Sequence, residues 1–170
     1  MKLIKATTGE FNPVYSAMKR NFTQEEIRDY DFALAVMKEE QYSIYHITDG
    51  DTRVGFCAIW ELSEFAFIEH FVIYESFRCK GYGTRVLELI KESFKTIVLE
   101  VEPPQDEMKA RRIAFYKRCG FFKNGIEYTQ PPYRPSDEAV KLILLSYPER
   151  LKDAEAVKKE LYRSVYKISD

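Results

Sequence analysis

The chain has 170 residues, of which 45% are hydrophobic and 31% charged, a composition typical of one globular domain with a substantial core. Its net charge of −1 lacks the basic excess of nucleic-acid-binding proteins. We therefore expect no nucleic acid as a partner. No apolar run approaches the roughly 18 residues that span a bilayer, so we expect no membrane as a partner either.

The number of cysteines and histidines and the sequence of the N-terminus argue against a disulfide-stabilised, metal-binding or secreted protein. Cys57, Cys79 and Cys119 are odd in number and far apart, which predicts neither a disulfide framework nor a zinc site. Two histidines, His46 and His70, are too few for a histidine-based metal site. From these cysteine and histidine counts we expect no metal. Residues 1–5 lack the apolar core of a signal peptide, so we expect a cytoplasmic protein.

The first half of the chain predicts a strand, two helices and a hairpin. Residues 3–6 form a strand, and residues 11–22 and 25–37 form helices, the second with a capping box between Thr23 and Glu26. Strands 42–48 and 54–61 follow, joined by Asp49-Gly50-Asp51, a good hairpin signal.

The second half alternates strands and helices. Residues 65–74 predict a strand, a helix then runs to about residue 95, and residues 96–101 form a strand. A helix at 108–119 ends at Gly120, and strands 121–128 and 140–146 flank a proline-containing loop. The order β-α-α-β-β-β-α-β-α-β-β implies an α/β (α+β) fold in three layers, with a mixed central sheet of about 6–7 strands.

Residues 77–84, Phe-Arg-Cys-Lys-Gly-Tyr-Gly-Thr, connect the strand at 65–74 to the helix after it. Amides at a helix start have no intrahelical partner, and the helix dipole places partial positive charge there. Gly81 and Gly83 leave room for a phosphate beside these amides, while Arg78 and Lys80 add positive charge. We call this stretch the cradle, and interpret it as a pyrophosphate-binding loop.

Spacing narrows the choice of ligand. The chain has no Gly-x4-Gly-Lys-Ser/Thr string for a P-loop. A dinucleotide fingerprint would need a third glycine at Val86, although Glu100 lies about twenty residues on, where that fingerprint places its ribose-binding acid. An NAD-type nucleotide-binding protein therefore stays open as an alternative.

Arg78, Gly81 and Gly83 fit the pattern Arg/Gln-x-x-Gly-x-Gly/Ala, which resembles the pyrophosphate motif of the GNAT superfamily of acyl-CoA-dependent N-acetyltransferases. The string from Tyr116 to Phe121 is similar to the Tyr-x-x-x-Gly-Phe of that family. The element order matches as well, over residues 1–147. The resemblance implies acetyl-CoA as cosubstrate and direct acetyl transfer to a primary amine of a small molecule or peptide.

The resemblance also implies a set of cofactor-binding residues. Backbone amides of the strand that splays in this family would contact the acetyl group and the pantetheine arm, and the cradle would hold the pyrophosphate. These residues are Phe71, Val72, Ile73, Arg78, Cys79, Lys80, Gly81, Tyr82, Gly83 and Thr84. Lys109 stands where many members have an asparagine, seven residues before the tyrosine, and could instead contact phosphate.

Two residues are candidates for catalysis. Strand alternation places Glu69 on one face with Phe67, Phe71 and Ile73, where a carboxylate among aromatic side chains should have a raised pKa and act as general base. Its neighbour His70 is an alternative. Tyr116 resembles the general acid of the family, but a phenol titrates near ~10 and a thiol near ~8.5, so a hydrogen bond to the leaving sulfur is the better-founded role.

The sequence says less about the acceptor than about the cofactor, and it leaves a further alternative function open. Carboxylates near strand ends favour a cationic amine, although they also suit a solvated rim; they are Glu61, Glu64, Glu69, Glu100, Glu102, Asp106 and Glu107. Residues 128–133 could form one wall of the acceptor cleft. A non-catalytic acyl-CoA-binding regulatory module would use the same cradle without turnover.

Residues 148–170 predict an amphipathic helix beyond the GNAT-like domain of residues 1–147, with Leu151, Ala154, Val157, Leu161 and Val165 on one face. We expect this helix to pack on its own domain, with a homodimer contact or a partner-binding surface as the alternatives.

Overall fold

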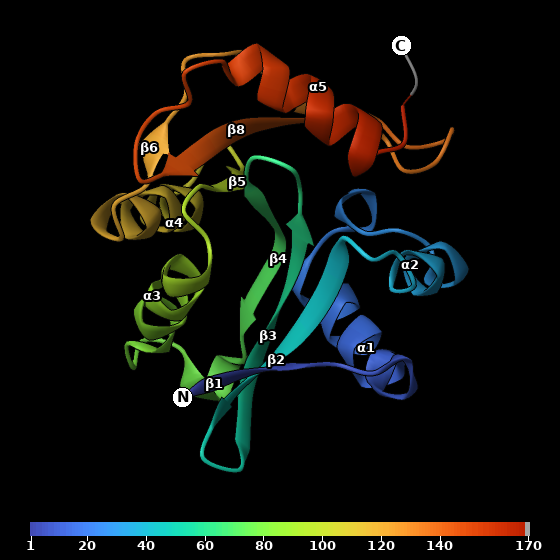
Figure 1. Cartoon of the computed structure of the whole chain (residues 1–170), viewed down its shortest axis with the longest axis vertical. Coiled ribbons are helices and arrows are strands. Elements are labelled where there is room, and N and C mark those ends of the chain that lie inside the picture. The colour runs from blue at the N-terminus through green and yellow to red at the C-terminus, as the bar shows by residue number, and fades with distance from the viewer. Residues whose placement is uncertain (169–170) are drawn as a thin grey trace.

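The computed structural model describes residues 1–168 as a mixed eight-stranded sheet covered by helices on both faces (Figure 1). The strands are β1 (Lys2–Lys5), β2 (Tyr42–Asp49), β3 (Thr52–Glu61), β4 (Ala66–Ile73), β5 (Ile97–Val101), β6 (Phe122–Lys123), β7 (Tyr128–Gln130) and β8 (Val140–Tyr147). The helices are α1 (Phe11–Asn21), α2 (Tyr30–Val36), α3 (Tyr82–Ser93), α4 (Glu107–Arg118) and α5 (Ala154–Ser164).

The sheet order is β1-β2-β3-β4-β5-β8-β6, with β7 paired to β8. Every pair is antiparallel except β4 with β5. This parallel pair follows from the crossover through α3, because parallel neighbours need a long connection. The mixed three-layer architecture expected from the element order is confirmed.

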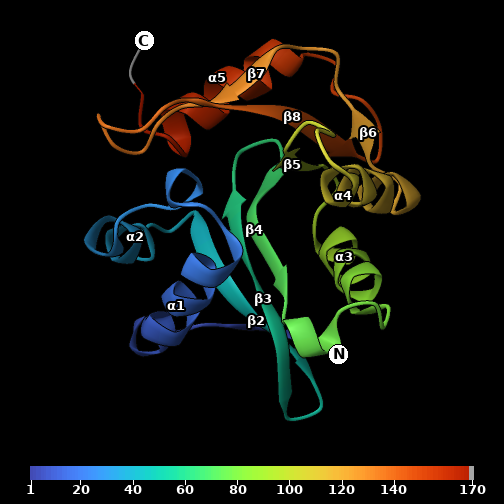
Figure 2. The same ribbon diagram turned by 180° about the vertical axis from the view of Figure 1, so that it is seen from behind.

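Two apolar clusters hold the layers together, one on each face of the sheet. On the first face α1, α2 and α5 contribute buried side chains such as Val14, Val36 and Leu161. On the second face α3 and α4 contribute Val86, Ile90 and Tyr116. Figure 2 shows α5 lying beside β7 and β8 when the molecule is viewed from behind.

The C-terminal helix is packed on the chain that carries it. Leu161 and Val165 have no exposed surface and belong to the same cluster as the α1 side chains. Tyr162 donates a hydrogen bond of 2.6 Å from its hydroxyl to the Thr129 carbonyl. The helix is shorter than the predicted segment, because Asp153 caps it by accepting from the Ala156 amide.

The predicted helix at 25–37 is wrong in its first half. The capping box of Thr23 and Glu26 is present, but it caps the 3-10 turn Gln24–Glu26, after which Ile27 is extended. The carbonyls of this segment are used by distant donors, since Arg134 binds those of Gln24 and Ile27 at 3.0 Å each. These tertiary bonds replace the ladder that a continuous helix would have formed.

The predicted strand 121–128 is also wrong, because it is split into β6 and β7. Asn124, only 3% exposed, lies at the break. Its side chain donates to the Leu144 carbonyl at 3.2 Å and accepts from the Leu151 amide at 2.8 Å. The buried amide thus joins the break to β8 and to the segment that leads to α5.

Within residues 1–168, none of the helices combines the length and the apolar character needed to cross a bilayer.

Candidate functional site

A cleft of about 1290 Å³ opens where β4 and β5 separate. The two strands pair only at Ala66 with Ile97, Phe67 with Val98 and Ile68 with Leu99. Beyond this last pair the strands diverge, and side chains of both line the cleft. We call the point after the Ile68–Leu99 pair the fork.

The register of β4 is interrupted beside the fork. Ala58 pairs with His70 and the next residue, Ile59, pairs with Ile68, which leaves Glu69 as the extra residue of a bulge. The predicted alternation is therefore wrong beyond Glu69. Phe71 and Ile73 pack on the α3 side of the sheet, whereas Glu69 faces the buried side chain of Arg28 on the α1 side.

Gly55 lets β3 follow this bent strand closely. A Cβ atom at this position would lie 2.1 Å from the Val72 carbonyl oxygen, so no larger residue fits without a backbone shift. Phe71, Val72 and Ile73, the predicted backbone contacts, all line the cleft.

The cradle lies at the opposite end of the cleft, at the start of α3. Cys79 and Gly81 both have left-handed backbone conformations, with φ of 59° and 78°. The Arg85 amide donates to the Gly81 carbonyl at 3.2 Å, so the amides of Tyr82, Gly83 and Thr84 precede the hydrogen-bonded turns of the helix. A run of amides shaped in this way forms a concave anion-binding surface.

Gly81 and Gly83 of the cradle are each favoured over larger residues for a different structural reason. At Gly81 a Cβ atom would meet nothing within 4 Å, but the positive φ disfavours any side chain. At Gly83 a Cβ atom would lie 3.1 Å from the Phe115 ring, so this glycine permits close packing of α3 against α4.

The basic side chains of the cradle, Arg78 and Lys80, donate hydrogen bonds to other groups of the protein. Arg78 lines the cleft and donates to the Ile73 carbonyl at 3.0 Å and to the Asn21 side chain at 2.7 Å. Lys80 does not line the cleft; its ammonium group donates to the Ser76 carbonyl at 2.9 Å. Arg20, Arg111, Arg112 and Arg118 also line the cleft.

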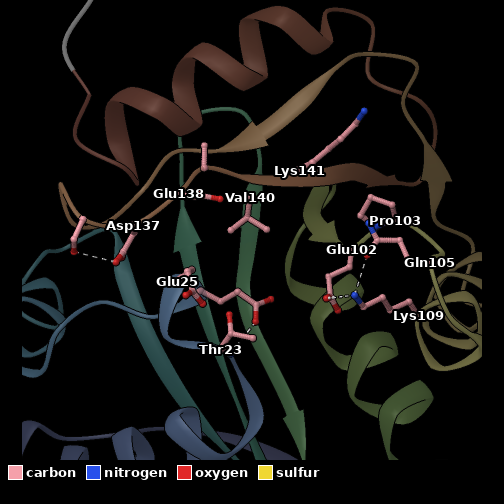
Figure 3. Close-up of a pocket in the computed structure, with 13 residues that line it drawn as sticks. Thr23, Glu25, Glu102, Pro103, Gln105, Lys109, Asp137, Glu138, Val140 and Lys141 are labelled. Atoms are coloured by element: carbon pink, nitrogen blue, oxygen red, sulfur yellow. Dashed lines mark hydrogen bonds and ion pairs between the residues drawn. The ribbon is translucent and has the colours of Figure 1, made fainter.

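Lys109 lies apart from the other predicted cofactor residues. Its ammonium group pairs with Glu102 at 3.0 Å and lines a smaller pocket of about 500 Å³. Figure 3 shows this pair on one side of the smaller pocket, with Glu25 and Glu138 among the residues on the other. Glu26 and Glu102 line both cavities, so the smaller pocket adjoins the cleft on its acidic side.

Glu69 is buried and paired, which changes its expected chemistry. Its side chain is 3% exposed, and its Oε1 accepts from Arg28 at 2.5 Å and from the Tyr133 hydroxyl at 3.1 Å. Burial opposes ionisation, but the Arg28 charge and the neighbouring His70 outweigh burial and lower the pKa of Glu69. The expected rise in its pKa is therefore wrong, because the sequence does not show that Arg28 turns inward.

His70, the alternative candidate, is mostly buried beside Glu69. Its Nδ1 lies 3.5 Å from Glu69 Oε2, and its Nε2 lies 3.2 Å from the Glu26 carbonyl. The ring packs edge-on against Phe22 at 4.6 Å between centroids.

Tyr116 lines the cleft from α4 and packs between Phe115 and Phe121. Burial raises its pKa to about 12. The phenol therefore remains neutral across the physiological range, able to donate a hydrogen bond but a weak proton donor.

Glu100, on β5, was identified from the sequence only as a possible ribose ligand or as part of the acidic rim. It lines the cleft and accepts hydrogen bonds from Tyr128 and from Tyr166, the latter at 2.9 Å to both carboxylate oxygens. Burial raises its pKa to about 7, and hydrogen bonds from the two phenols only partly oppose this rise. The signal in the sequence was a lone acid in an apolar strand.

The other expected acceptor residues divide into two groups. Gln130 and Tyr133, from the loop expected to form a wall, line the cleft together with Tyr166. Glu61 and Glu64 line neither cavity, Asp106 caps α4, and Glu107 pairs with Arg111. Among residues 1–168 no group of three or more His, Cys, Asp or Glu side chains is placed to hold a metal ion.

Comparison with known proteins gives the family context for this geometry. A protein of Bacillus subtilis (strain 168) named "Putative acetyltransferase YjbC" is 25% identical over 162 residues, covering 92% of this chain and 82% of that protein. A solved structure from Bacteroides thetaiotaomicron, described as a "Putative acetyltransferase from GNAT family", has a TM-score of 0.92 at 32% identity. That match covers 99% of this chain and 100% of the other.

A Bacillus subtilis acetyltransferase solved in complex with CoA shares the fold, with a TM-score of 0.56 at 17% identity over 85% of this chain and 97% of that one. The model of the Acetyltransferase (GNAT) family matches residues 9–121, which is most of the chain. The chain therefore belongs to the Acetyltransferase (GNAT) family, and it is an acyltransferase that uses acetyl-CoA.

Proposed function

We propose that the protein transfers the acetyl group of acetyl-CoA directly to a primary amine of a small molecule or peptide. The observation that carries this proposal is the continuous cleft, which joins a basic, glycine-shaped cradle at one end to a group of carboxylates near the fork at the other. Positive charge suits the CoA phosphates, and negative charge suits a cationic amine.

The cofactor fits the residues present. The left-handed Cys79 and Gly81 shape the amides from Cys79 to Thr84 into a concave surface for the pyrophosphate. Because β4 bends away from β5 after Ile68, the backbone around Phe71, Val72 and Ile73 borders the cleft, where it would contact the pantetheine arm and the acetyl carbonyl. Acetyl-CoA supplies the activated acyl group as a thioester.

The acceptor would approach from the acidic side. Glu26 and Glu102 line both the cleft and the smaller pocket, and Glu25, Asp137 and Glu138 line only the latter. An ammonium group would be attracted to the carboxylates of this opening. Tyr116, on the opposite face of the sheet, would donate a hydrogen bond to the leaving sulfur.

A charged substitution in the cradle tests this assignment. Gly81→Glu should weaken acetyl-CoA binding at least about 100-fold, measured by calorimetric titration, because it places an anion beside the pyrophosphate. Gly81→Ala is the matched control: it imposes the same backbone strain at φ 78° but adds no charge and meets no atom within 4 Å. Equal losses in both variants would assign the effect to backbone strain and not to the added charge. Unchanged affinity in Gly81→Glu would mean that the cradle does not bind the phosphates.

Turnover is tested separately by release of the CoA thiol in the presence of amines. Polyamines, lysine-containing peptides and neutral amines should differ, with the cationic acceptors preferred. Tight acetyl-CoA binding with no turnover of any amine in the panel would contradict the proposed transfer to amines while leaving the cradle intact.

A further inference from the structure

Two carboxylates occupy equivalent places at the fork. Glu69 directly follows Ile68 on β4, and Glu100 directly follows Leu99 on β5, the last residues that pair. Ile68 and Leu99 both pack on the α3 side, so the next residue on each strand faces the α1 side. Glu69 and Glu100 therefore share one face of the sheet where the strands begin to separate, and both line the cleft.

The Glu69 carboxylate already forms an ion pair, with the Arg28 guanidinium group. Its Oε1 accepts from both Arg28 and Tyr133, and the side chains of Arg28 and Glu69 are each 3% exposed. Its pKa is lowered, because the Arg28 charge outweighs the burial that would raise it. A carboxylate that remains ionised in a buried ion pair is a poor acceptor for the proton of an amine.

Glu100 has the opposite surroundings. In the part of the chain that the structure describes, no Lys, Arg or His nitrogen lies within 4 Å of its carboxylate, and its hydrogen bonds come from the neutral hydroxyls of Tyr128 and Tyr166. Its residue as a whole is only partly buried, which leaves it open to the cleft.

The titratable groups around Glu100 come from several elements. They are Glu69 from β4, Glu26 from the 3-10 turn before α2, Tyr128 from β7, Tyr133 from the loop after β7, and Tyr162 and Tyr166 from α5 and the residues after it. Burial and the two like charges raise the pKa of Glu100 to about 7, whereas Tyr128 and Tyr166 lower it. Environments that separate the pKa values of two neighbouring carboxylates are typical of acid–base sites.

We infer that Glu100, rather than Glu69, is the catalytic residue that accepts the proton of the acceptor ammonium, and that Tyr128 and Tyr166 position its carboxylate. This inference rests on the proposed transfer to an amine. The ammonium gives one proton to the Glu100 carboxylate, and the neutral nitrogen attacks the thioester carbonyl. As the N–C bond forms and the C–S bond breaks, the second nitrogen proton passes to the sulfur, giving amide and CoA thiol. Glu100 then releases its proton to solvent.

The pH dependence of kcat/KM in Glu100→Gln tests the inference. The wild type should show a rise centred near pH 7, where Glu100 loses its proton. Glu100→Gln should lose this rise and about 100-fold in kcat/KM at pH 7.5, because general-base catalysis typically contributes that much. Its affinity for acetyl-CoA should stay within about 2-fold of the wild type, since Glu100 lies away from the cradle.

Tyrosine variants provide an independent test that does not alter either carboxylate. Tyr166→Phe removes a hydrogen bond that favours the ionised form of Glu100, so the rise in kcat/KM should move to higher pH. Tyr162→Phe removes a phenol from the same helical segment, but its hydroxyl donates to the Thr129 carbonyl, so its pH profile should match the wild type.

The outcomes are distinguishable. If the wild type acetylates no amine, the proposed function fails and the assignment of Glu100 fails with it. If the wild type turns over but Glu100→Gln keeps the rise near pH 7, or if Glu69→Gln abolishes it instead, the assignment of Glu100 alone is overturned. A Tyr166→Phe profile that does not move would also contradict it.

Discussion

Arg28 connects the candidate site to two distant parts of the chain. Its guanidinium group donates to Glu69 at 2.5 Å and to the Val165 carbonyl at 2.9 Å, and its Cζ lies 4.5 Å from the centroid of the Tyr133 ring. A buried guanidinium needs this much compensation, because removal from water costs several kcal/mol per ion. Arg28 therefore fixes the position and the charge of Glu69.

Arg28→Met should destabilise the protein by about 3 kcal/mol at pH 7.5, because it leaves Glu69 as an unpaired buried charge. Without Arg28 the folded-state pKa of Glu69 should rise above its unfolded value, so the loss should grow as pH increases from 5 to 8. Urea unfolding at several pH values measures this effect.

The double variant Arg28→Met with Glu69→Gln is the control for this prediction. It removes both charges, so it should recover part of the lost stability and should show little of the extra pH dependence. Identical unfolding curves for the single and double variants would mean that Glu69 is not the source of the penalty.

Tyr116→Phe should lower kcat about 10-fold with little change in acetyl-CoA affinity, because one hydrogen bond to the leaving sulfur is lost. The reduction should not depend on pH below about 10, since burial raises the pKa of this phenol to about 12. Tyr147→Phe removes a phenol outside the cleft and should leave kcat unchanged. A parallel loss of affinity and kcat in Tyr116→Phe would indicate a binding residue.

At the scale of elements, local signals were sufficient wherever the contacts are local. The hairpin at Asp49-Gly50-Asp51 forms as expected, with Gly50 at φ 59°. Gly120, with φ 81°, follows the end of α4 as expected for a helix stop. The helix start after the cradle was predicted because the glycines and the apolar periodicity are adjacent in the sequence, while its binding of pyrophosphate stays a prediction.

The acceptor side was less predictable, because it depends on side chains that meet from separate segments. The extended backbone at Ile27 was not expected, because the Arg134 side chain that binds the Ile27 carbonyl lies 107 positions away in the sequence. The bulge at Glu69 reversed the faces of Phe71 and Ile73 for the same reason, since the register depends on pairing with β3. Burial raises the pKa of Glu100, and this burial comes from segments that meet only in the fold. Tyr166, which donates to the Glu100 carboxylate, lies beyond the matched motifs.

The docking of α5 can be tested by truncating its most buried side chain. Leu161 has no exposed surface, so Leu161→Ala should cost about 3 kcal/mol of unfolding free energy. Thermal unfolding should show a lower melting temperature, whereas Lys159→Ala, on the exposed side of the same helix, should change it little. Melting temperatures that agree for the two variants would argue against the observed packing of α5.

At the scale of the whole molecule, the two carboxylates at the fork make opposite contributions to stability. The pKa of Glu69 is lowered by folding, so its contribution is present above its unfolded pKa and is lost as pH falls below about 4. The pKa of Glu100 is raised to about 7, so its contribution is present below its unfolded pKa and is lost as pH rises to 7.

These signs predict a difference between the wild type and Glu100→Gln. Between pH 4.5 and pH 8 the wild type should lose about 3 kcal/mol more unfolding free energy than the variant, because the variant has no carboxylate to ionise in the buried site. Urea titrations of both proteins at these pH values measure the difference. Parallel stability curves would mean that Glu100 titrates with an ordinary pKa.

The hydrogen bond between Arg28 and the Val165 carbonyl has a consequence for the order of folding. It spans 137 positions, whereas the contacts of Arg78 with Ile73 and of Lys80 with Ser76 span 5 and 4. Closing long loops costs more entropy before any contact forms, so long-range pairings tend to form late. We expect the cradle to be structured early in refolding and the acceptor side last, so that a refolding chain would bind the nucleotide end of acetyl-CoA before it can catalyse transfer.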